Sequence, residues 1–128
     1  MNNMHILLVD DEDDVREVAA VSLQAIGGWR VSAASGGAEG IAMARAERPD
    51  AILLDVMMPD LDGPATFAEL QADPQTRDIP VILLTAKAHG ADRRGFAALG
   101  VTGMLTKPFD PTTLSDEVTA ILTGSAAA

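Results

Sequence analysis

Several residue types are missing or scarce in this chain of 128 residues, and each absence excludes a kind of chemistry. Cysteine is absent, which excludes disulfides, thiolate nucleophiles and cysteine-bound zinc or iron–sulfur clusters. The two histidines, His5 and His89, are too few and too far apart to indicate a histidine metal site. No apolar run approaches the ~20 residues that span a bilayer, and the amino terminus lacks the basic segment of a signal peptide. We therefore expect a soluble, cytoplasmic protein that does not bind a membrane.

Aromatic and basic residues are also scarce. With one tryptophan, three phenylalanines and no tyrosine, the core must consist mainly of aliphatic residues and alanine. Nine basic residues stand against nineteen acidic ones, and the net charge of −10 disfavours direct binding to nucleic acid. The length fits a single domain, which we expect at residues 1–124, with a disordered tail at residues 125–128.

Short apolar runs alternate with helical patterns along the chain. The runs predict strands at residues 6–9, 31–34, 51–54, 81–84 and 103–106. The helical patterns lie at residues 13–26, 38–47, 64–73 and 91–99, and from Asp110 as N-cap onward. The first of them carries an apolar stripe that includes Val18, Leu23 and Ile26. This alternation predicts an α/β fold, a doubly wound parallel sheet with helices on both faces.

Chemically active side chains gather where the predicted strands end. Asp10 and Asp11 follow the first strand, Asp55 follows the third, Thr85 the fourth and Lys107 the fifth. Because ligands of such folds bind beyond the carboxyl ends of the strands, we expect these side chains to converge there. Each has an ordinary explanation when taken alone: charge at a helix N-terminus, a strand-end hydroxyl or a solvated lysine.

Taken together, these side chains favour phosphoryl chemistry. Three carboxylates repel one another unless a cation lies between them, and an all-oxygen site suits Mg²⁺. The Asp55 carboxylate is ionised at neutral pH and needs no general base to act as a nucleophile. Lys107 and the metal could then neutralise a transferred phosphoryl group, to which Thr85 could donate a hydrogen bond.

Four stretches carry a family resemblance, in order and with matching spacing: residues 6–12 (ILLVDDE), 53–63 (LLDVMMPDLDG), 81–86 (VILLTA) and 107–109 (KPF). Over about residues 4–123 the sequence resembles response-regulator receiver domains, the phosphoacceptor modules of two-component signalling. The resemblance implies a (βα)5 flavodoxin-like fold with a five-stranded parallel sheet in the order 2-1-3-4-5.

The resemblance also implies roles for particular residues. Asp55 corresponds to the phosphorylated aspartate. Asp10 and Asp11 correspond to the acidic pair that binds Mg²⁺ together with Asp55 and the backbone carbonyl of Met57. The implied activity is a phosphoacceptor switch that catalyses its own phosphorylation and dephosphorylation, rather than an enzyme acting on other substrates.

Three further positions concern the switch itself. Thr85 corresponds to the hydroxyl that turns towards the phosphoryl group and Lys107 to the ammonium partner, whose bond to Pro108 is cis in the family. Family members often carry tyrosine or phenylalanine three residues before this lysine, where the present chain has Met104. Methionine cannot repeat an aromatic rotamer switch, so the route from the site to the surface is expected to differ.

The expected phosphodonor is a histidine kinase or a histidine phosphotransfer protein, and the expected output is binding to a downstream effector or a phosphorylation-dependent homodimer. With no output domain after residue 124, we expect a single-domain regulator or a fragment of a larger protein. One alternative is a receiver-like interaction module that is never phosphorylated. A hydrolase of the haloacid-dehalogenase type would need an aspartate in place of Met57.

Overall fold

The computed structural model describes residues 3–86 and 90–124, of which residues 90–93 are described by their backbone alone. His89 and the tail expected at residues 125–128 lie outside these residues. Within the part of the chain that is described, no helix combines the length and the apolar character needed to cross a membrane.

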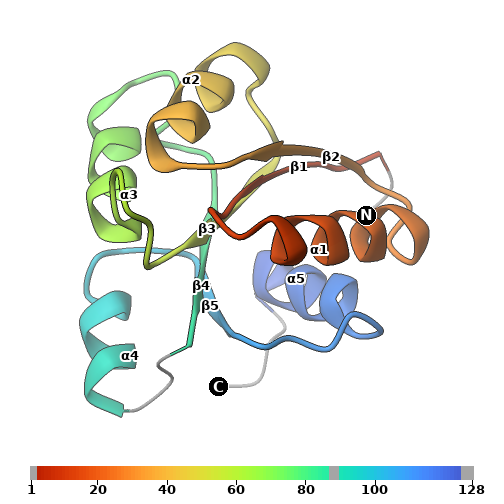
Figure 1. The fold of residues 1–128 in the computed structure, drawn as a ribbon. Helices are drawn as coiled ribbons and strands as arrows, with labels where there is room; N and C mark the ends of the chain where they lie inside the picture. Colours follow the sequence, from red (N-terminus) through yellow and green to blue (C-terminus); the bar gives the residue numbers. More distant parts are fainter. Residues whose placement is uncertain (1–2, 87–89, 125–128) are drawn as a thin grey trace.

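Five strands alternate with five helices in the described chain (Figure 1). The strands are β1 (His5–Val9), β2 (Arg30–Ala34), β3 (Ala51–Asp55), β4 (Val81–Thr85) and β5 (Gly103–Thr106). The helices are α1 (Asp13–Ala25), α2 (Gly37–Glu47), α3 (Gly63–Ala72), α4 (Gly90–Ala97) and α5 (Leu114–Thr123). All neighbouring strands are parallel, in the order β2-β1-β3-β4-β5, which confirms the predicted doubly wound sheet.

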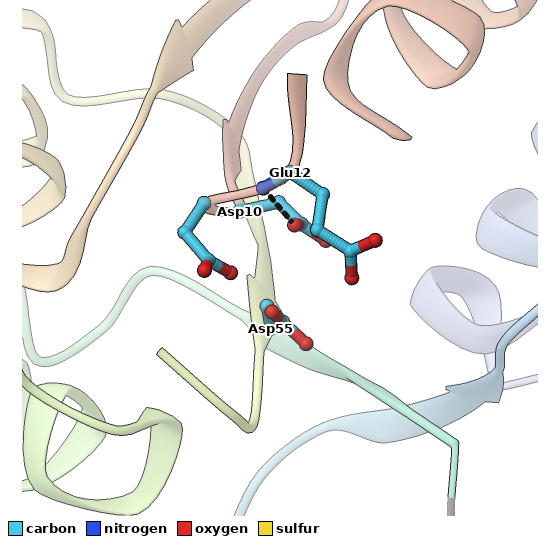
Figure 2. Close-up of side chains that lie close together, drawn as sticks. Asp10, Glu12 and Asp55 are labelled. Atoms are coloured by element: carbon cyan, nitrogen blue, oxygen red, sulfur yellow. Dashed lines mark hydrogen bonds between the residues drawn. The ribbon is translucent and has the colours of Figure 1, made fainter. Parts of the chain in front are cut away.

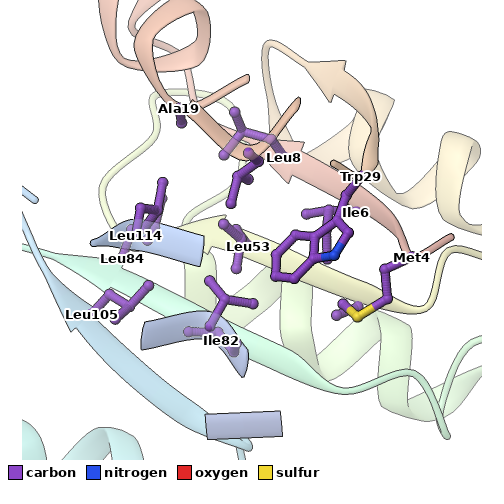
Figure 3. Packing of buried hydrophobic residues seen from close by; sticks show 13 residues of the cluster. Met4, Ile6, Leu8, Ala19, Trp29, Leu53, Ile82, Leu84, Leu105 and Leu114 are labelled. Atoms are coloured by element: carbon purple, nitrogen blue, oxygen red, sulfur yellow. The ribbon is translucent and has the colours of Figure 1, made fainter. Parts of the chain in front are cut away.

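The sheet has a separate hydrophobic cluster on each face. Every residue of β1, β3 and β4 is buried, because alternate side chains point to opposite faces and both faces are covered. Helices α1 and α5 cover one face, where Trp29 packs among the aliphatic side chains (Figure 3). Both the strands and the helices contribute members to this cluster, which include Ile6, Leu8, Leu53, Ile82, Leu84, Leu23, Leu114 and Val118.

Helices α2 and α3 cover the other face, with Phe96 of α4 packed at its border. Its members include Leu7, Val9, Ile52, Leu54, Leu83, Ile41, Phe67 and Leu70. Both clusters are mainly aliphatic, as the shortage of aromatic residues predicts. The two clusters fix the positions of the strands, and through them the positions of the groups at the strand ends.

The last helix begins later than its sequence pattern indicates. Helix α5 starts after Thr113 rather than after Asp110. The carboxylate of Asp110 accepts hydrogen bonds from the backbone N–H (2.9 Å) and hydroxyl (2.6 Å) of Thr112, and the Asp110 carbonyl accepts one from the N–H of Thr113 (3.1 Å). Asp110 and Pro111 therefore form a capped turn that precedes the helix, a local alternative that aspartate side chains offer to the helical backbone.

Candidate functional site

The predicted site residues meet at the carboxyl edge of the sheet. Asp10 follows β1, Asp55 ends β3 and Thr85 ends β4, and these three residues are 0%, 3% and 3% exposed. The backbone N–H of Lys107 donates to the carbonyl of Thr85 (2.8 Å), which extends the pairing of β4 with β5 by one step. Because β1, β3 and β4 are neighbours in the sheet, residues far apart in sequence reach one small region.

One ammonium group lies among three carboxylates in this region. Lys107 Nζ is 3.0 Å from Asp10 Oδ2, 3.2 Å from Asp55 Oδ1 and 3.3 Å from Glu12 Oε1. Figure 2 shows the three carboxylates close together, with the backbone N–H of Glu12 donating to Asp10 Oδ1 at 2.9 Å. The lysine side chain is itself largely buried, at 14% exposure. Lys107 thus joins these carboxylates in a charge network with more negative than positive groups.

Burial and a like charge both act on Asp55. Removal from water, followed by the negative charge of Asp10, raises the pKa of Asp55 to about 6. The Lys107 ammonium and a hydrogen bond from the backbone N–H of Met57 oppose this rise in the pKa. Asp55 is consequently ionised at neutral pH, with a carboxylate more basic than that of an ordinary aspartate.

The lysine responds in the opposite sense to its surroundings. Burial alone would lower the pKa of Lys107, but the hydrogen bond and charge of Asp10, joined by those of Asp55, raise it above its ordinary value. Lys107 therefore stays charged at any physiological pH.

The donor set fits a hard divalent cation. Asp10, Asp11, Glu12 and Asp55 each offer a carboxylate oxygen, and these oxygens lie within 4.8 Å of one another. Oxygen ligands of this kind suit Mg²⁺ or Ca²⁺, and a site with few protein ligands suits Mg²⁺, which retains several waters. Glu12 is a member of this group that the sequence pattern does not single out, and its position directly after Asp10 and Asp11 is the available signal.

The loop after β3 packs tightly against the backbone of Asp55. The N–H of Gly63 donates to the carbonyl of Val56 (2.8 Å), and the Asp62 side chain caps α3 by accepting from the N–H of Ala65 (2.8 Å). A Cβ at Gly63 would lie 2.7 Å from the backbone oxygen of Asp55. Glycine at this position therefore allows α3 to begin directly beside the residue that ends β3.

Met57 and Met58 differ sharply in this loop. Met57 is 72% exposed next to Asp55, whereas Met58 is buried in the cluster under α2 and α3. Met104, on β5, is half-buried and packs against the same cluster. The residue that replaces the family's aromatic side chain thus lies against the face that α2 and α3 cover.

Asp60 has a role that the sequence pattern did not show. Its carboxylate accepts hydrogen bonds from the backbone N–H groups of Gly37 (3.2 Å) and Ala38 (3.1 Å) at the start of α2. These bonds lower the pKa of Asp60 below its ordinary value. A Cβ at Gly36 would lie 2.9 Å from Asp60 Oδ1, so the glycine leaves room for this cap.

The structure thus brings Asp10, Asp11, Asp55 and Lys107 together. It places Thr85 at the same edge of the sheet, and Met57 two residues beyond Asp55 in the adjoining loop.

A scan of family models matches residues 6–119 to the response regulator receiver domain. This match covers most of the chain, which therefore belongs to the receiver domain family of two-component signalling. Among solved structures, the chemotaxis response regulator CheY4 of Vibrio cholerae is similar to it, with 31% identity, 93% coverage of this chain, 98% coverage of that chain and a TM-score of 0.86.

A second solved structure carries information on metal. The receiver domain of a Pseudomonas aeruginosa sensor histidine kinase, described with a magnesium ion coordinated in its active site cleft, is 32% identical, with a TM-score of 0.83. That comparison covers 94% of this chain and 98% of the kinase receiver.

Curated relatives fall into two groups by length. Protein PilH of Pseudomonas aeruginosa is 37% identical over 119 residues, which are 93% of this chain and 98% of PilH. The DNA-binding transcriptional regulator RpaA of a Synechocystis strain is 37% identical over 118 residues, which are 91% of this chain but 48% of RpaA. The chain spans about half the length of the transcriptional regulators that it matches.

Proposed function

We propose that this chain is a phosphoacceptor switch that takes a phosphoryl group onto Asp55 from a phosphohistidine of a sensor kinase or a histidine phosphotransfer protein. The observation that carries the proposal is that Asp55 is buried and has a raised pKa. The Lys107 ammonium lies 3.2 Å from its carboxylate, and further carboxylates lie beside it. In the transfer, an Asp55 oxygen forms a bond to phosphorus while the bond from phosphorus to the histidine nitrogen breaks. The nitrogen leaves with the bonding electron pair.

The acidic residues would hold Mg²⁺ for this transfer. Asp10, Asp11 and Asp55, with the backbone carbonyl of Met57, are the proposed ligands, and their oxygen chemistry matches the cation. When bound, Mg²⁺ offsets negative charge on the phosphoryl oxygens. Asp10 and Asp55 repel each other, and a cation held by their carboxylates would relieve this repulsion.

Lys107 and Thr85 act on the phosphoryl group itself. Lys107 is charged and tethered within hydrogen-bond reach of Asp55, so its ammonium can pair with a phosphoryl oxygen. The Thr85 hydroxyl donates a hydrogen bond to the same group. Hydrolysis, in which water attacks phosphorus and releases inorganic phosphate, restores the Asp55 carboxylate and ends the signal.

The output is a change in surface rather than a released product. Movement of Thr85 towards the phosphoryl group changes the packing of β4 and β5, where Met104 lies, and shifts the population of surface conformations around α4 and α5. A downstream effector protein, or a second phosphorylated copy, then binds this surface. We assign these roles to one receiver domain at residues 1–124, acting in the cytoplasm.

The direct test is intact mass after incubation with Mg²⁺ and acetyl phosphate, a small phosphodonor. We expect the wild-type chain to gain one phosphoryl mass. Asp55→Asn, and wild type with a chelator in excess, should show no gain.

Absence of any gain in folded wild type, both with acetyl phosphate and with a histidine phosphotransfer protein, would contradict the proposal. It would favour a receiver-like interaction module that is never phosphorylated. Gain in Asp55→Asn would instead move the acceptor to another residue.

A further inference from the structure

Arg16, in the first turns of α1, reaches back to the end of β1. Its Nη1 donates to the backbone carbonyl of Asp10 (2.7 Å), while its Nη2 pairs with the Asp13 carboxylate. Its backbone N–H donates to the carbonyl of Glu12 (3.0 Å). One residue therefore contacts the chain at three points between Asp10 and Asp13.

The exposure of the partners shows which contact is held firmly. The Arg16 side chain is 19% exposed and Asp10 is fully buried, whereas the Asp13 side chain is 89% exposed. A pair with so exposed a carboxylate adds little energy by itself. The pairing of Nη2 with Asp13 nevertheless orients the planar guanidinium, so that Nη1 can donate to the Asp10 carbonyl.

The segment that Arg16 holds carries three acidic groups of the site. Asp10, Asp11 and Glu12 are consecutive, and within this segment the Glu12 N–H donates a hydrogen bond to Asp10 Oδ1 (2.9 Å). Carboxylates that repel one another tend to spread the segment apart. A donor fixed to the Asp10 carbonyl opposes this tendency.

We infer that Arg16 is a positioning residue that presets the acidic segment for Mg²⁺, which rests on the function proposed above. It does not touch the cation or the phosphoryl group, and acts through the backbone of Asp10. Groups that orient metal ligands from behind commonly change metal affinity by ~10- to 100-fold when removed.

Charge and position make opposite predictions for this residue. As a positive charge beside an acidic site, Arg16 should repel Mg²⁺, so its removal should tighten binding. As a positioning residue, its removal should loosen the acidic segment and weaken binding. Arg16→Ala therefore separates the two effects by the sign of the change.

The experiment measures Mg²⁺ affinity by calorimetry at fixed ionic strength on four folded proteins: wild type, Arg16→Ala, Arg16→Lys and Arg45→Ala. Arg45 is the matched control because it also pairs with one aspartate, Asp73 (Nε to Oδ2, 2.6 Å). Arg45 lies on α2, away from the segment Asp10 to Glu12. Amide hydrogen exchange at Glu12, without metal, reports the order of the segment independently of any activity.

We expect Arg16→Ala to bind Mg²⁺ about 10-fold more weakly than wild type and to exchange the Glu12 amide faster. Arg16→Lys, which keeps the charge but lacks the planar fork, should show both changes, and Arg45→Ala should show neither.

Tighter or unchanged Mg²⁺ binding in Arg16→Ala would overturn the inference, even if that variant were less stable. An equal loss in Arg45→Ala would overturn it too, because the effect would then be general. With either result, phosphorylation of wild type would leave the proposed function standing. Failure of wild type to bind Mg²⁺ would contradict both the role inferred for Arg16 and the proposed function.

Discussion

At the scale of single residues, the site is a balance between burial and charge. One ammonium, from Lys107, faces more carboxylates than it can neutralise, and the cost falls on Asp55, whose pKa rises to about 6. Removing the lysine would leave Asp10 buried without its ion-pair partner, which is far more costly than losing a surface pair. The site is therefore preassembled but electrostatically strained.

This strain predicts a pH-dependent effect of Asp55→Asn on stability. The folded-state pKa of Asp55 exceeds its unfolded value, so the stabilising contribution of its protonated form is complete below the unfolded pKa. That contribution is lost as pH rises through about 6. Asparagine does not titrate. The unfolding free energy of Asp55→Asn should therefore rise relative to that of wild type between about pH 4 and pH 7, by no more than about 2 kcal/mol after allowance for screening by water.

Urea unfolding across this range, with chelator present, measures the difference. Asp60, Asp73 and Asp110 have lowered pKa values and give the opposite slope, but they act equally in both proteins and cancel. A difference that stays constant with pH would contradict the assigned pKa of Asp55.

At the scale of elements, strands were more predictable than the contacts between loops. Continuous apolar runs identify β1, β3 and β4, and the polar residue after each run locates the site, because parallel strands end at one edge. Sequence could not reveal that Asp60 caps α2 or that Arg16 holds Asp10, since these contacts depend on how separate loops meet in space. The prediction that Asp110 is the N-cap of the last helix was wrong for another reason. A capped turn and a helix N-cap have the same sequence signature.

The start of α3 provides a prediction on helix placement. Gly63→Ala would force α3 away from β3, because the added Cβ would lie 2.7 Å from the Asp55 carbonyl oxygen and 2.8 Å from Val56 Cα. We expect a loss of about 1–3 kcal/mol in unfolding free energy and slower phosphorylation by acetyl phosphate.

Gly95→Ala is the matched control, since a Cβ there meets nothing within 4 Å. Inside α4 it should raise stability by up to about 1 kcal/mol and leave the phosphorylation rate unchanged. Similar destabilisation by both substitutions would show that the close approach of Gly63 to β3 is unimportant.

At the scale of the whole molecule, three of the five exposed large apolar side chains of the described residues lie on α1 or at its C-cap. The predicted stripe of this helix is only partly used by the core: Leu23 is buried, whereas Val18 and Ile26 are 45% and 54% exposed, as is Val21 at 57%. The three exposed side chains line a groove with Pro111. Val18 also borders a hollow that reaches Lys107. An apolar surface beside the proposed phosphoacceptor is suited to a protein donor, because the proposed phosphohistidine would have to reach Asp55.

Val18→Asn should therefore slow phosphotransfer from a histidine phosphotransfer protein by about 10-fold. It should leave phosphorylation by acetyl phosphate unchanged, because a small donor needs no docking surface. Both rates are measured by intact mass over time, with Leu99→Asn as the control, because Leu99 is an exposed apolar residue just after α4, a helix that lies on the opposite side of the sheet from α1 (Figure 1). Equal slowing with both donors would place the effect at the site rather than at docking.

The cap that Asp60 places on α2 also bears on the order of folding. Helix α2 precedes β3 in the chain, yet its first N–H groups bond a carboxylate that follows β3 by five residues. This first turn can gain those bonds only once β3 has joined β1 and carried the loop into place. We therefore expect the beginning of α2 to be among the last parts of the helix to become protected as the chain folds, although the whole helix is synthesised before Asp60.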